Sequence, residues 1–354
     1  TGIDYDHEDL RGQLWINTAE DINGNGKLDP WPESEVRDDV RGDFNGIDDD
    51  GNGYVDDVIG FDFIDQALQN FGDASRRDAD PYDEHSHGTI VSGVIAAAHN
   101  NNTGVTGMAY NSKIMTLRAM DVFGYGESDD IAAAIVYGAL NGADVMNFSF
   151  GELYDSPLMR DAVKFAYQLG CVMAASSGNN GADYRHYPSD YPEVISVGGS
   201  NIDDERYSRS NFGSHLDIIA PGVGILSTTL NNEYRRATGT SLSAPFVASV
   251  AAMLKEKNPD HGPDEIKALL QLSAKDIFQK GWDIYAGAGI LDAAKALEER
   301  GNPVMMINSP GNESVFDKSR LDSIAVTGSV LIPLLQDYEL LIAPGDNQKV
   351  NFLE

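Results

Sequence analysis

The sequence contains a single cysteine, Cys171, among 354 residues, so no disulfide can form within the chain. It has no unbroken run of about 20 apolar residues, the length that a membrane-spanning helix needs. Basic residues are scarce, since 25 lysines and arginines stand against 56 acidic residues and give a net charge of −31. Such a charge opposes binding to nucleic-acid phosphates and to anionic lipid surfaces. We therefore expect no nucleic-acid partner and no membrane span.

The acidic residues are concentrated in the first quarter of the chain. Residues 1–85 hold 24 aspartates and glutamates and only 6 lysines and arginines. Charge of this density is typical of a disordered segment, a solvated surface or a cation-binding region. Glycines, asparagines and large apolar residues such as Trp15, Trp31 and Tyr54 are interspersed with the acids. We therefore expect this segment to be folded rather than disordered.

From about residue 87, solid apolar runs of strand length alternate with longer stretches of helical periodicity. Strands of this kind are typical of a parallel sheet that is covered by helices on both faces. We therefore predict a doubly wound, mostly parallel α/β fold with its functional site at the carboxyl ends of the strands. The predicted strands are 113–117, 144–149, 171–175, 194–198 and 216–220, and the predicted helices are 88–98, 129–140, 156–169, 241–257, 263–272 and 291–299.

The composition changes near residues 301–303, which suggests a domain boundary. Beyond it, short β-rich runs at 304–308, 323–330 and 338–343 are separated by turn residues. Three strands seldom form a stable unit alone, so we expect 303–354 to be the start of a β-sandwich that continues beyond the chain. The first domain is expected to cover 1–300 and to contain an acidic insertion at 17–60.

Three short segments in the regular part of the chain carry chemically useful residues. His87 opens an apolar helical stretch, Asn179 lies in a small-residue loop after a predicted buried strand, and Ser241 starts a long apolar helix. Each also has an ordinary structural explanation. A histidine or serine at a helix start is commonly a cap, and an asparagine after a strand commonly forms a turn. None of the three segments is diagnostic by itself.

Together, and in this order, the three segments closely resemble the subtilisin-like serine proteases, the subtilase family, and the resemblance extends from residue 1 to about residue 297. Residues 239–245, GTSLSAP, match the family signature G-T-S-x-[SA]-x-P. The resemblance implies a subtilisin-like fold, with Ser241 as nucleophile, His87 as general base and Asn179 as side-chain donor to the oxyanion. Residue chemistry agrees, because a serine hydroxyl needs a base and a developing oxyanion needs donors held in place.

One expected catalytic residue falls outside the chain. The family's catalytic aspartate stands immediately before a Thr/Ser-Gly pair, which here is Thr1-Gly2. The aspartate and its strand would thus lie just upstream of Thr1. Asp4 matches a different position of the motif, so we do not assign it a catalytic role. Without the aspartate, we expect the activity of the chain to be impaired on the order of 10⁴-fold, because the histidine loses control of its tautomer and orientation.

The same resemblance implies where an extended peptide substrate binds. Glycines at the ends of strands leave the backbone open for strand-like pairing with a peptide. His186 matches the position at the floor of the primary specificity pocket, where an imidazole would make the pocket shallower and more polar; a surface-loop role is the alternative. The residues expected to clamp the substrate are Ser149, Phe150, Gly151, Gly124, Tyr125 and Gly126.

Two acidic loops have the spacing of a calcium-binding loop. Oxygen-bearing side chains stand at positions 1, 3, 5 and 9 and glycine at position 6, as in the first nine positions of an EF-type loop. The glutamate expected at position 12 is absent, since Ile59 occupies that place in the second loop. A solvated acidic surface is the alternative for both. The expected ligands are Asp48, Asp50, Asn52 and Asp56 in one loop and Asp21, Asn23, Asn25 and Asp29 in the other.

The resemblance implies a third calcium site. Asp9 and Asn101 would supply side-chain oxygens to it. Backbone carbonyls of the loop that contains Asn101 would complete it, and these belong to His99, Thr103 and Val105.

These observations lead to one principal hypothesis and one rival. The principal hypothesis is an extracellular, calcium-stabilised serine endopeptidase that acts on polypeptide substrates, with a possible propeptide and further C-terminal domains. Secretion is what the family resemblance implies, and calcium loops of this kind suit the millimolar calcium found outside cells. The rival is a catalytically silent, calcium-dependent binding or adhesion module. An aspartate directly before Thr1 would favour the enzyme.

Overall fold

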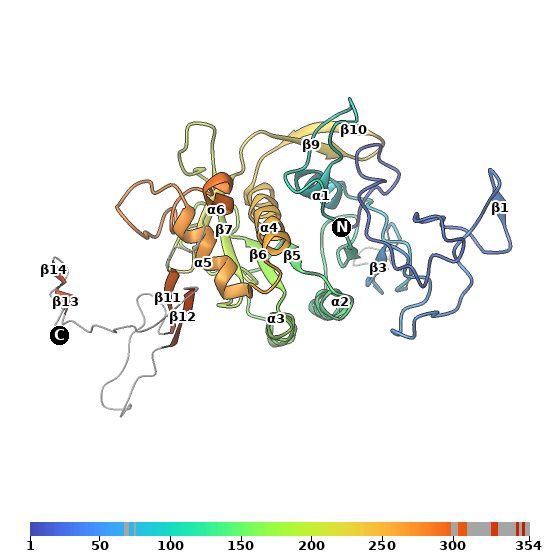
Figure 1. Ribbon diagram of the computed structural model, residues 1–354, viewed down its shortest axis with the longest axis horizontal. Helices are drawn as coiled ribbons and strands as arrows, with labels where there is room; N and C mark the ends of the chain where they lie inside the picture. The colour runs from blue at the N-terminus through green and yellow to red at the C-terminus, as the bar shows by residue number, and fades with distance from the viewer. Residues whose placement is uncertain are drawn as a thin grey trace. The chain divides into compact units, whose positions relative to one another are not determined.

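The computed structural model describes residues 1–66, 71–73 and 76–298, together with four short strands further on. The chain divides into two units, Thr1–Glu298 and Glu299–Glu354 (Figure 1). Among the described residues, no helix has both the length and the apolar character needed to cross a membrane. The chemistry expected from the sequence lies entirely in the first unit.

A four-stranded parallel sheet forms the centre of the first unit. Its strands are adjacent in chain order: β5 (Val145–Phe148), β6 (Val172–Ser176), β7 (Ile195–Ser200) and β8 (Ile218–Pro221). All residues of β6 and β7 are buried, as their unbroken apolar runs predict. The predicted parallel sheet is therefore confirmed, and its strand ends differ from the predicted ones by only one or two residues.

A second parallel pair lies beside this sheet but is not hydrogen-bonded to it. Strands β3 (Gly60–Asp62) and β4 (Thr116–Arg118) pair with each other, whereas β4 and β5 do not pair. Strand β4 falls within and just beyond the predicted run 113–117. Strand β3 was not predicted, because its three residues are embedded in the acidic segment and carry no recognisable pattern.

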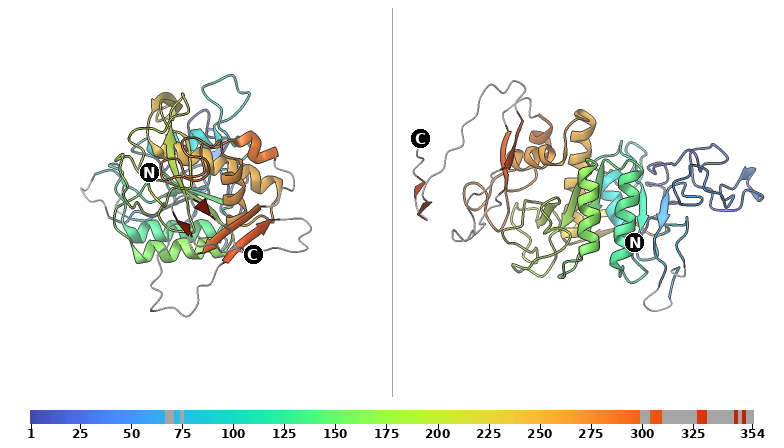
Figure 2. Two further views of the ribbon diagram at one scale, coloured as in Figure 1. Left: turned by 90° about the vertical axis from the view of Figure 1, so that its left-hand side faces the viewer. Right: turned by 90° about the horizontal axis from the view of Figure 1, so that it is seen from below.

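Helices cover the sheet. Helices α2 and α3 pack side by side (Figure 2), and their buried residues join those of β5 and β6 in one core that includes Ile131, Met146, Val163 and Met173. Helix α4 contacts all four strands of the sheet and also α1, α5 and α6. Six helices lie in the described part of the chain and correspond to the six predicted: α1 (His87–Ala96), α2 (Ser128–Leu140), α3 (Pro157–Gln168), α4 (Thr240–Lys257), α5 (Pro263–Ser273) and α6 (Ala293–Glu298).

Two hairpins were not predicted. Strands β9 (Ile225–Thr229) and β10 (Glu233–Ala237) pair antiparallel, and β9 packs on α1. Strands β1 (Val36–Arg37) and β2 (Val40–Arg41) form a small exposed hairpin in the acidic segment. In both turns, Asn or Asp residues adopt left-handed backbone conformations, which these residue types tolerate.

In the second unit, the structure describes two antiparallel pairs. One joins β11 (Val304–Ser309) to β12 (Thr327–Leu331), and the other joins β13 (Gly345–Asp346) to β14 (Lys349–Val350). The predicted strands at 304–308 and 323–330 overlap the first pair. The predicted strand at 338–343 lies outside the described residues. The β-sandwich therefore stays a prediction.

A buried ion pair joins the acidic segment to strand β4. Arg118, at the end of β4, donates to Asp62, at the end of β3, at 2.6 Å, and both side chains are 1% exposed. Arg118 also donates to Glu84 at 2.8 Å. Burial raises the pKa of Asp62 to about 7 even though the Arg118 charge acts in the opposite direction. The ionised form of Asp62 therefore depends on the positive charge of Arg118.

We expect Arg118→Met to lower the free energy of unfolding at pH 8 by about 3–5 kcal/mol, because it leaves a buried carboxylate unpaired. The loss should shrink at pH 5, where Asp62 can be protonated. Urea unfolding at both pH values measures this. Arg160→Met is the control, since the Arg160–Asp155 pair is about one-third exposed on each side and should contribute nothing measurable. Equal losses in the two variants would contradict the role given to the buried pair.

Candidate active site

Ser241 is the second residue of α4, and a neighbouring strand end holds its backbone. Gly239 occupies the N-cap position with a φ of +157°, which side chains rarely adopt. Pro245 has no N–H, so the Ser241 carbonyl loses its helical partner. The Ser149 hydroxyl, just after β5, donates to that carbonyl at 2.7 Å, and the Ser241 hydroxyl donates to the Ser149 carbonyl at 3.2 Å. These reciprocal bonds fix Ser241 at the carboxyl end of the sheet.

The side chain of Asn179, which follows β6, is oriented by the same helix end. Its Oδ1 accepts from the backbone N–H of Thr240 at 2.9 Å and from the Thr240 hydroxyl at 3.3 Å. Because a backbone N–H can only donate, Asn179 presents its oxygen there, and its Nδ2 has no partner among the described residues. The backbone N–H of Ser241 belongs to the first helical turn, where such groups lack helical acceptors. Two donors are therefore available to an anion at this helix end.

His87 is the first residue of α1 and is half-buried. Burial, the nearby amino group of Thr1 and the His85 ring together lower the pKa of its imidazole to about 4. The ring is therefore neutral near pH 7, which is the form a general base requires. Within the described part of the chain, the imidazole has no hydrogen-bond partner, so no group there fixes its tautomer.

Asp83, which the sequence reasoning missed, positions the first turn of α1. Its buried carboxylate accepts from the backbone N–H groups of Ser86 at 2.9 Å and Thr89 at 2.8 Å, and from the Thr89 hydroxyl at 2.7 Å. These are N–H groups that a helix start leaves without helical acceptors. An aspartate four residues before the candidate base is the sequence signal that could have revealed this cap. The backbone N–H of Asp4 also donates to the Thr89 hydroxyl, at 2.9 Å, but the Asp4 carboxylate points to the β9–β10 turn, where it accepts from the backbone N–H of Asn231.

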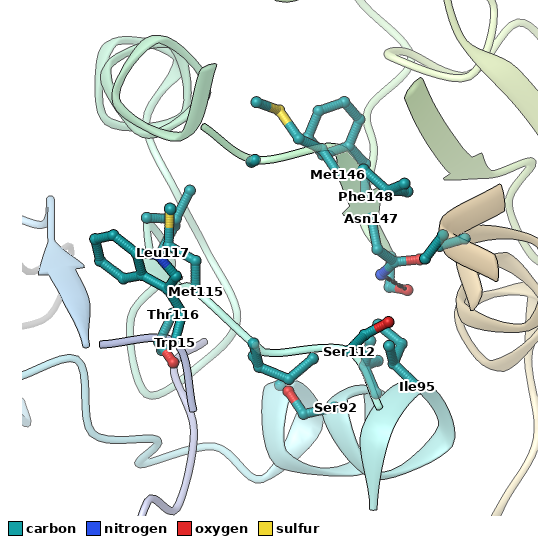
Figure 3. A pocket seen from close by; sticks show the side chains of 18 of the residues that line it. Trp15, Ser92, Ile95, Ser112, Met115, Thr116, Leu117, Met146, Asn147 and Phe148 are labelled. Atoms are coloured by element: carbon teal, nitrogen blue, oxygen red, sulfur yellow. Dashed lines mark hydrogen bonds between the residues drawn. The ribbon is translucent and has the colours of Figure 1, made fainter. Parts of the chain in front are cut away.

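A cavity of about 740 Å³ lies between β4 and β5 and is lined by both Thr1 and His87. Figure 3 shows residues of the two strands facing each other across it, among them Leu117 on one side and Asn147 on the other. Two buried polar atoms of its lining, Thr116 Oγ1 and Asn147 Oδ1, have no hydrogen-bond partner in the described residues. The cavity therefore lies next to the candidate base, and two of the polar atoms that line it lack hydrogen-bond partners.

The residues expected to bind substrate after β5 lie close to Ser241 and to His186. A Cβ on Gly151 would lie 2.2 Å from Cε1 of His186, so only glycine fits beside that ring. Nδ1 of His186 contacts the carbonyl of Ser176 at 3.0 Å, and burial lowers the pKa of the imidazole. Phe150 is packed against the core formed by β5 and β6.

The other expected substrate segment, 124–126, follows β4. Gly124 has a φ of +78°, and a Cβ there would lie 3.5 Å from the ring of His85, two residues before the candidate base. Tyr125 is 59% exposed, and the Asp121 carboxylate accepts from its backbone N–H at 2.9 Å. A Cβ on Gly126 would meet the Ala119 carbonyl at 2.2 Å. Both segments thus lie near the candidate catalytic residues.

The second acidic loop gains a carboxylate that its own sequence lacks. Oxygens of Asp48 and Asp50 lie within 4.8 Å of an oxygen of Glu20, which is fully buried. Burial raises the pKa of Glu20 to about 7. The Asn52 amide donates to Asp50 at 3.1 Å, whereas the Asp56 carboxylate turns away to accept from the backbone of residues 45 and 46. Sequence reasoning missed Glu20, because it lies 28 residues before Asp48.

The first acidic loop repeats this geometry. The Asp21 carboxylate accepts from backbone N–H groups at loop positions 4, 5 and 6, as the Asp48 carboxylate does in its own loop. The amides of Asn23 and Asn25 both donate to Asp29, at 2.8 and 2.6 Å. The spacing repeat in the sequence is therefore also a structural repeat.

The residues of the third expected calcium site are also brought together. The carboxylate of Asp9, which is fully buried, accepts from the Asn101 amide and, at 2.9 Å, from the backbone N–H of Val105. The backbone N–H of Thr103 donates to Asn101 at 3.2 Å. The His99 ring packs on Tyr110, with the ring centres 3.9 Å apart.

Comparison with known proteins agrees with the resemblance seen in the sequence. A thermophilic serine proteinase from Bacillus sp. strain AK1 is 39% identical over 224 residues, which are 63% of this chain and 53% of that protein. Alkaline elastase YaB from Bacillus sp. strain YaB is 36% identical over 214 residues, which are 60% of this chain and 56% of that protein. The chain thus spans about half the length of these curated relatives.

The fold comparison leads to the same group of proteins. A solved structure described as proteases from Pseudoalteromonas arctica has a TM-score of 0.66 and 27% sequence identity, and the match covers 84% of this chain and 87% of that one. Residues 1–289 match the model of the subtilase family. This match covers more than half of the chain and includes all three segments with candidate catalytic residues, so the chain belongs to the subtilase family.

Proposed function

We propose that the protein is a serine endopeptidase in which Ser241 is the nucleophile, His87 the general base and Asn179 a donor to the oxyanion. The observation that carries this proposal is the meeting of Ser241 and the free Asn179 amide at the N-terminus of α4, beside the carboxyl ends of β5 and β6. A catalytic aspartate directly ahead of Thr1 completes the proposed triad.

The reaction would proceed through an acyl-enzyme. The Ser241 hydroxyl leaves its bond with the Ser149 carbonyl and attacks the peptide carbonyl, while the neutral His87 imidazole takes the hydroxyl proton. The resulting oxyanion accepts from Asn179 Nδ2 and from the Ser241 N–H, both of which are in place beforehand. His87 then gives its proton to the departing amine, and water hydrolyses the ester by the same steps.

The proposed aspartate has a specific task at His87. With a pKa of about 4, the imidazole is a weak base, since the efficiency of proton transfer follows basicity. A carboxylate bonded to the far ring nitrogen would raise that pKa and fix the tautomer. The kcat of the chain without the aspartate should therefore be lower by about 10⁴-fold, which is the loss that a serine protease shows when its triad aspartate is replaced by asparagine.

We further propose that polypeptides bind in extended form along the segments 149–151 and 124–126. Glycines at 151 and 126 would leave their backbone N–H and C=O groups accessible for pairing with a peptide strand, whereas the Gly124 N–H already donates to the Asp121 carbonyl at 2.9 Å and only its C=O would be accessible. His186 would close the primary pocket beside Gly151, where its ring makes that pocket shallow.

We propose that calcium binds at both acidic loops and at Asp9, and that the protein is extracellular. Three carboxylates within 4.8 Å, one of them buried, repel one another unless a proton or a cation compensates them. Glu20 would supply the acidic ligand missing from position 12 of the second loop. Loops of this type suit the millimolar calcium outside cells, which supports secretion.

The test uses the chain extended by an aspartate directly before Thr1. In this protein, Ser241→Ala should abolish both peptide hydrolysis and labelling by a fluorophosphonate. Ser243→Ala is the control: this hydroxyl is buried two residues further along the same helix and has no partner in the described residues, so its loss should leave labelling intact. Labelling that persists in Ser241→Ala would refute the nucleophile assignment. Intact folding with no labelling of the parent would instead favour the silent binding module.

Asn179→Ala should lower kcat by roughly 10²–10³ and leave KM nearly unchanged, because the bond strengthens only as charge develops on the oxyanion. Steady-state kinetics on a peptide anilide measure the two constants separately. Asn180→Ala, at the exposed neighbouring position, should behave like the parent. A raised KM with unchanged kcat would mean that Asn179 positions the substrate instead.

Replacing Asp48 and Asp50 by asparagine should reduce the rise in Tm that calcium produces relative to chelator, and leave the part due to Asp9. A saturated site contributes RT ln(1 + [Ca]/Kd), about 2.7 kcal/mol at a hundredfold excess over Kd. The control replaces Asp38 and Asp39 by asparagine, which changes the charge equally at exposed positions of the same insertion. An unchanged calcium effect in the first variant would mean that the loop is only a solvated surface.

A further inference from the structure

The ring of His186 lies between two chain segments at the carboxyl end of the sheet. Strands β5 and β6 pair as far as Phe148 and Ala175. Beyond that point, a Cβ on Gly151 would lie 2.2 Å from Cε1 of the ring, and a Cβ on Gly178 would lie 3.0 Å from its Cδ2. Because neither glycine has a side chain, the imidazole fits between the two segments that leave the strands.

The hydrogen bond of His186 determines which tautomer the ring adopts. Its Nδ1 lies 3.0 Å from the carbonyl oxygen of Ser176, which can only accept, so Nδ1 carries the proton. Burial lowers the pKa of the imidazole, so the ring is neutral near pH 7 and Nε2 keeps a free lone pair. Nε2 has no hydrogen-bond partner in the described part of the chain. The ring therefore presents an unpaired acceptor.

Asn211 places an unpaired donor next to this acceptor. Its Oδ1 accepts from the backbone N–H of Asn180 at 2.8 Å, which identifies the other end of the amide as Nδ2. The side chain is fully buried, and Nδ2 has no hydrogen-bond partner among the described residues. Nδ2 lies 2.5 Å from the position that a Cβ on Gly178 would occupy, and Nε2 of His186 lies 3.2 Å from the same position. The two unpaired atoms are therefore neighbours, beside the residue that precedes Asn179.

The chemistry of these two atoms matches a side-chain carboxamide. A buried polar group without a partner costs free energy, and a ligand group that pairs with it recovers that cost. A carboxamide has both functions that are needed, since its NH₂ can donate to Nε2 of His186 and its oxygen can accept from Nδ2 of Asn211. Leucine has the size and branching of asparagine but neither function. Aspartate can only accept, so its carboxylate would face the lone pair of Nε2.

We propose that the primary pocket recognises an asparagine side chain of the polypeptide substrate, with Nε2 of His186 as acceptor and Nδ2 of Asn211 as donor. Asparagine is the shorter of the two carboxamide side chains, and it suits a pocket that the His186 ring makes shallow. Asn211 thereby becomes a specificity-determining residue. This inference rests on the proposed function in one respect, namely that the substrate residue before the scissile bond occupies this pocket beside Ser241.

Peptide binding to the Ser241→Ala chain tests recognition without hydrolysis. The probes are peptides of the sequence Ala-Ala-Ala-X-Ala-Ala in which X is asparagine, leucine or aspartate, and calorimetric titration measures Kd. The asparagine peptide should bind at least about tenfold more tightly than the other two, because a site built to pair polar groups rejects analogues that lack them. The NMR signal of Nε2 in His186 should shift with this peptide alone. Equal binding of the leucine or aspartate peptide, or no binding of any of the three, would overturn the proposal.

Two further variants, made in the Ser241→Ala chain, locate the recognition. His186→Phe keeps a ring but removes the acceptor, and Asn211→Asp keeps Oδ1 but replaces the Nδ2 donor by an oxygen. Each should reduce the preference for the asparagine peptide over the leucine peptide to less than about twofold. Asn201→Asp is the control, because Oδ1 of Asn201 also accepts from backbone N–H groups but lies in a different turn, and this variant should keep the preference. If His186→Phe does not fold, Asn211→Asp decides alone, and an undiminished preference in it would overturn the proposal.

Hydrolysis by the chain extended by an aspartate directly before Thr1 separates this inference from the proposed function. Its kcat/KM for cleavage after asparagine should exceed that after leucine by at least about tenfold. Equal values would overturn the inference about the pocket and leave the endopeptidase intact. Preferential binding of the asparagine peptide to the Ser241→Ala chain, without hydrolysis of any peptide by the extended chain, would support the recognition and overturn the proposed catalysis.

Discussion

The site depends on one buried helix, α4, whose start is fixed at the carboxyl end of the sheet. It packs against all four strands of the central sheet, and its apolar residues are buried along most of its length. A helix held in this way cannot rotate or slide without disrupting the core, so its first turn is rigid. Pro245 breaks one bond of that turn, and Ser149 replaces it from the strand side. The proline that removes a helical hydrogen bond thus leaves a carbonyl through which the helix is bonded to the end of β5.

Much of the fold could be predicted because the central strands are solid apolar runs and the helices have clear periodicity. The run at 194–198 matches β7 since every residue of that strand is buried. Strand β3 and the two hairpins escaped prediction because pairing partners, rather than their own residues, define them. The resemblance to a family supplied Ser241, His87 and Asn179, whereas no sequence pattern indicates that Asn179 is oriented by Thr240.

Residues whose role depends on contacts with other segments, or on one acid among many, were missed. Glu20 approaches Asp48 and Asp50 only after the chain has folded back, so no spacing rule includes it. Asp83 lies four residues before His87 and could have been recognised as a cap, but one aspartate among so many acids carries little information. Asp56 has the expected spacing, yet its carboxylate binds the backbone of residues 45 and 46. The spacing of oxygen-bearing residues therefore identifies the two loops, but it does not identify which side-chain oxygens lie close together in them.

The position of Glu20 links the two acidic loops mechanically. Its carboxylate belongs to the second loop, while the next residue, Asp21, is the first position of the first loop. One peptide bond thus connects a residue of the second loop's carboxylate cluster to the first residue of the first loop. Ordering of one loop therefore removes conformational freedom from the other loop. Two ions bound in this arrangement would share the entropic cost of ordering, so the second would bind more tightly than the first. The insertion would then respond to calcium over a narrower concentration range than two independent loops.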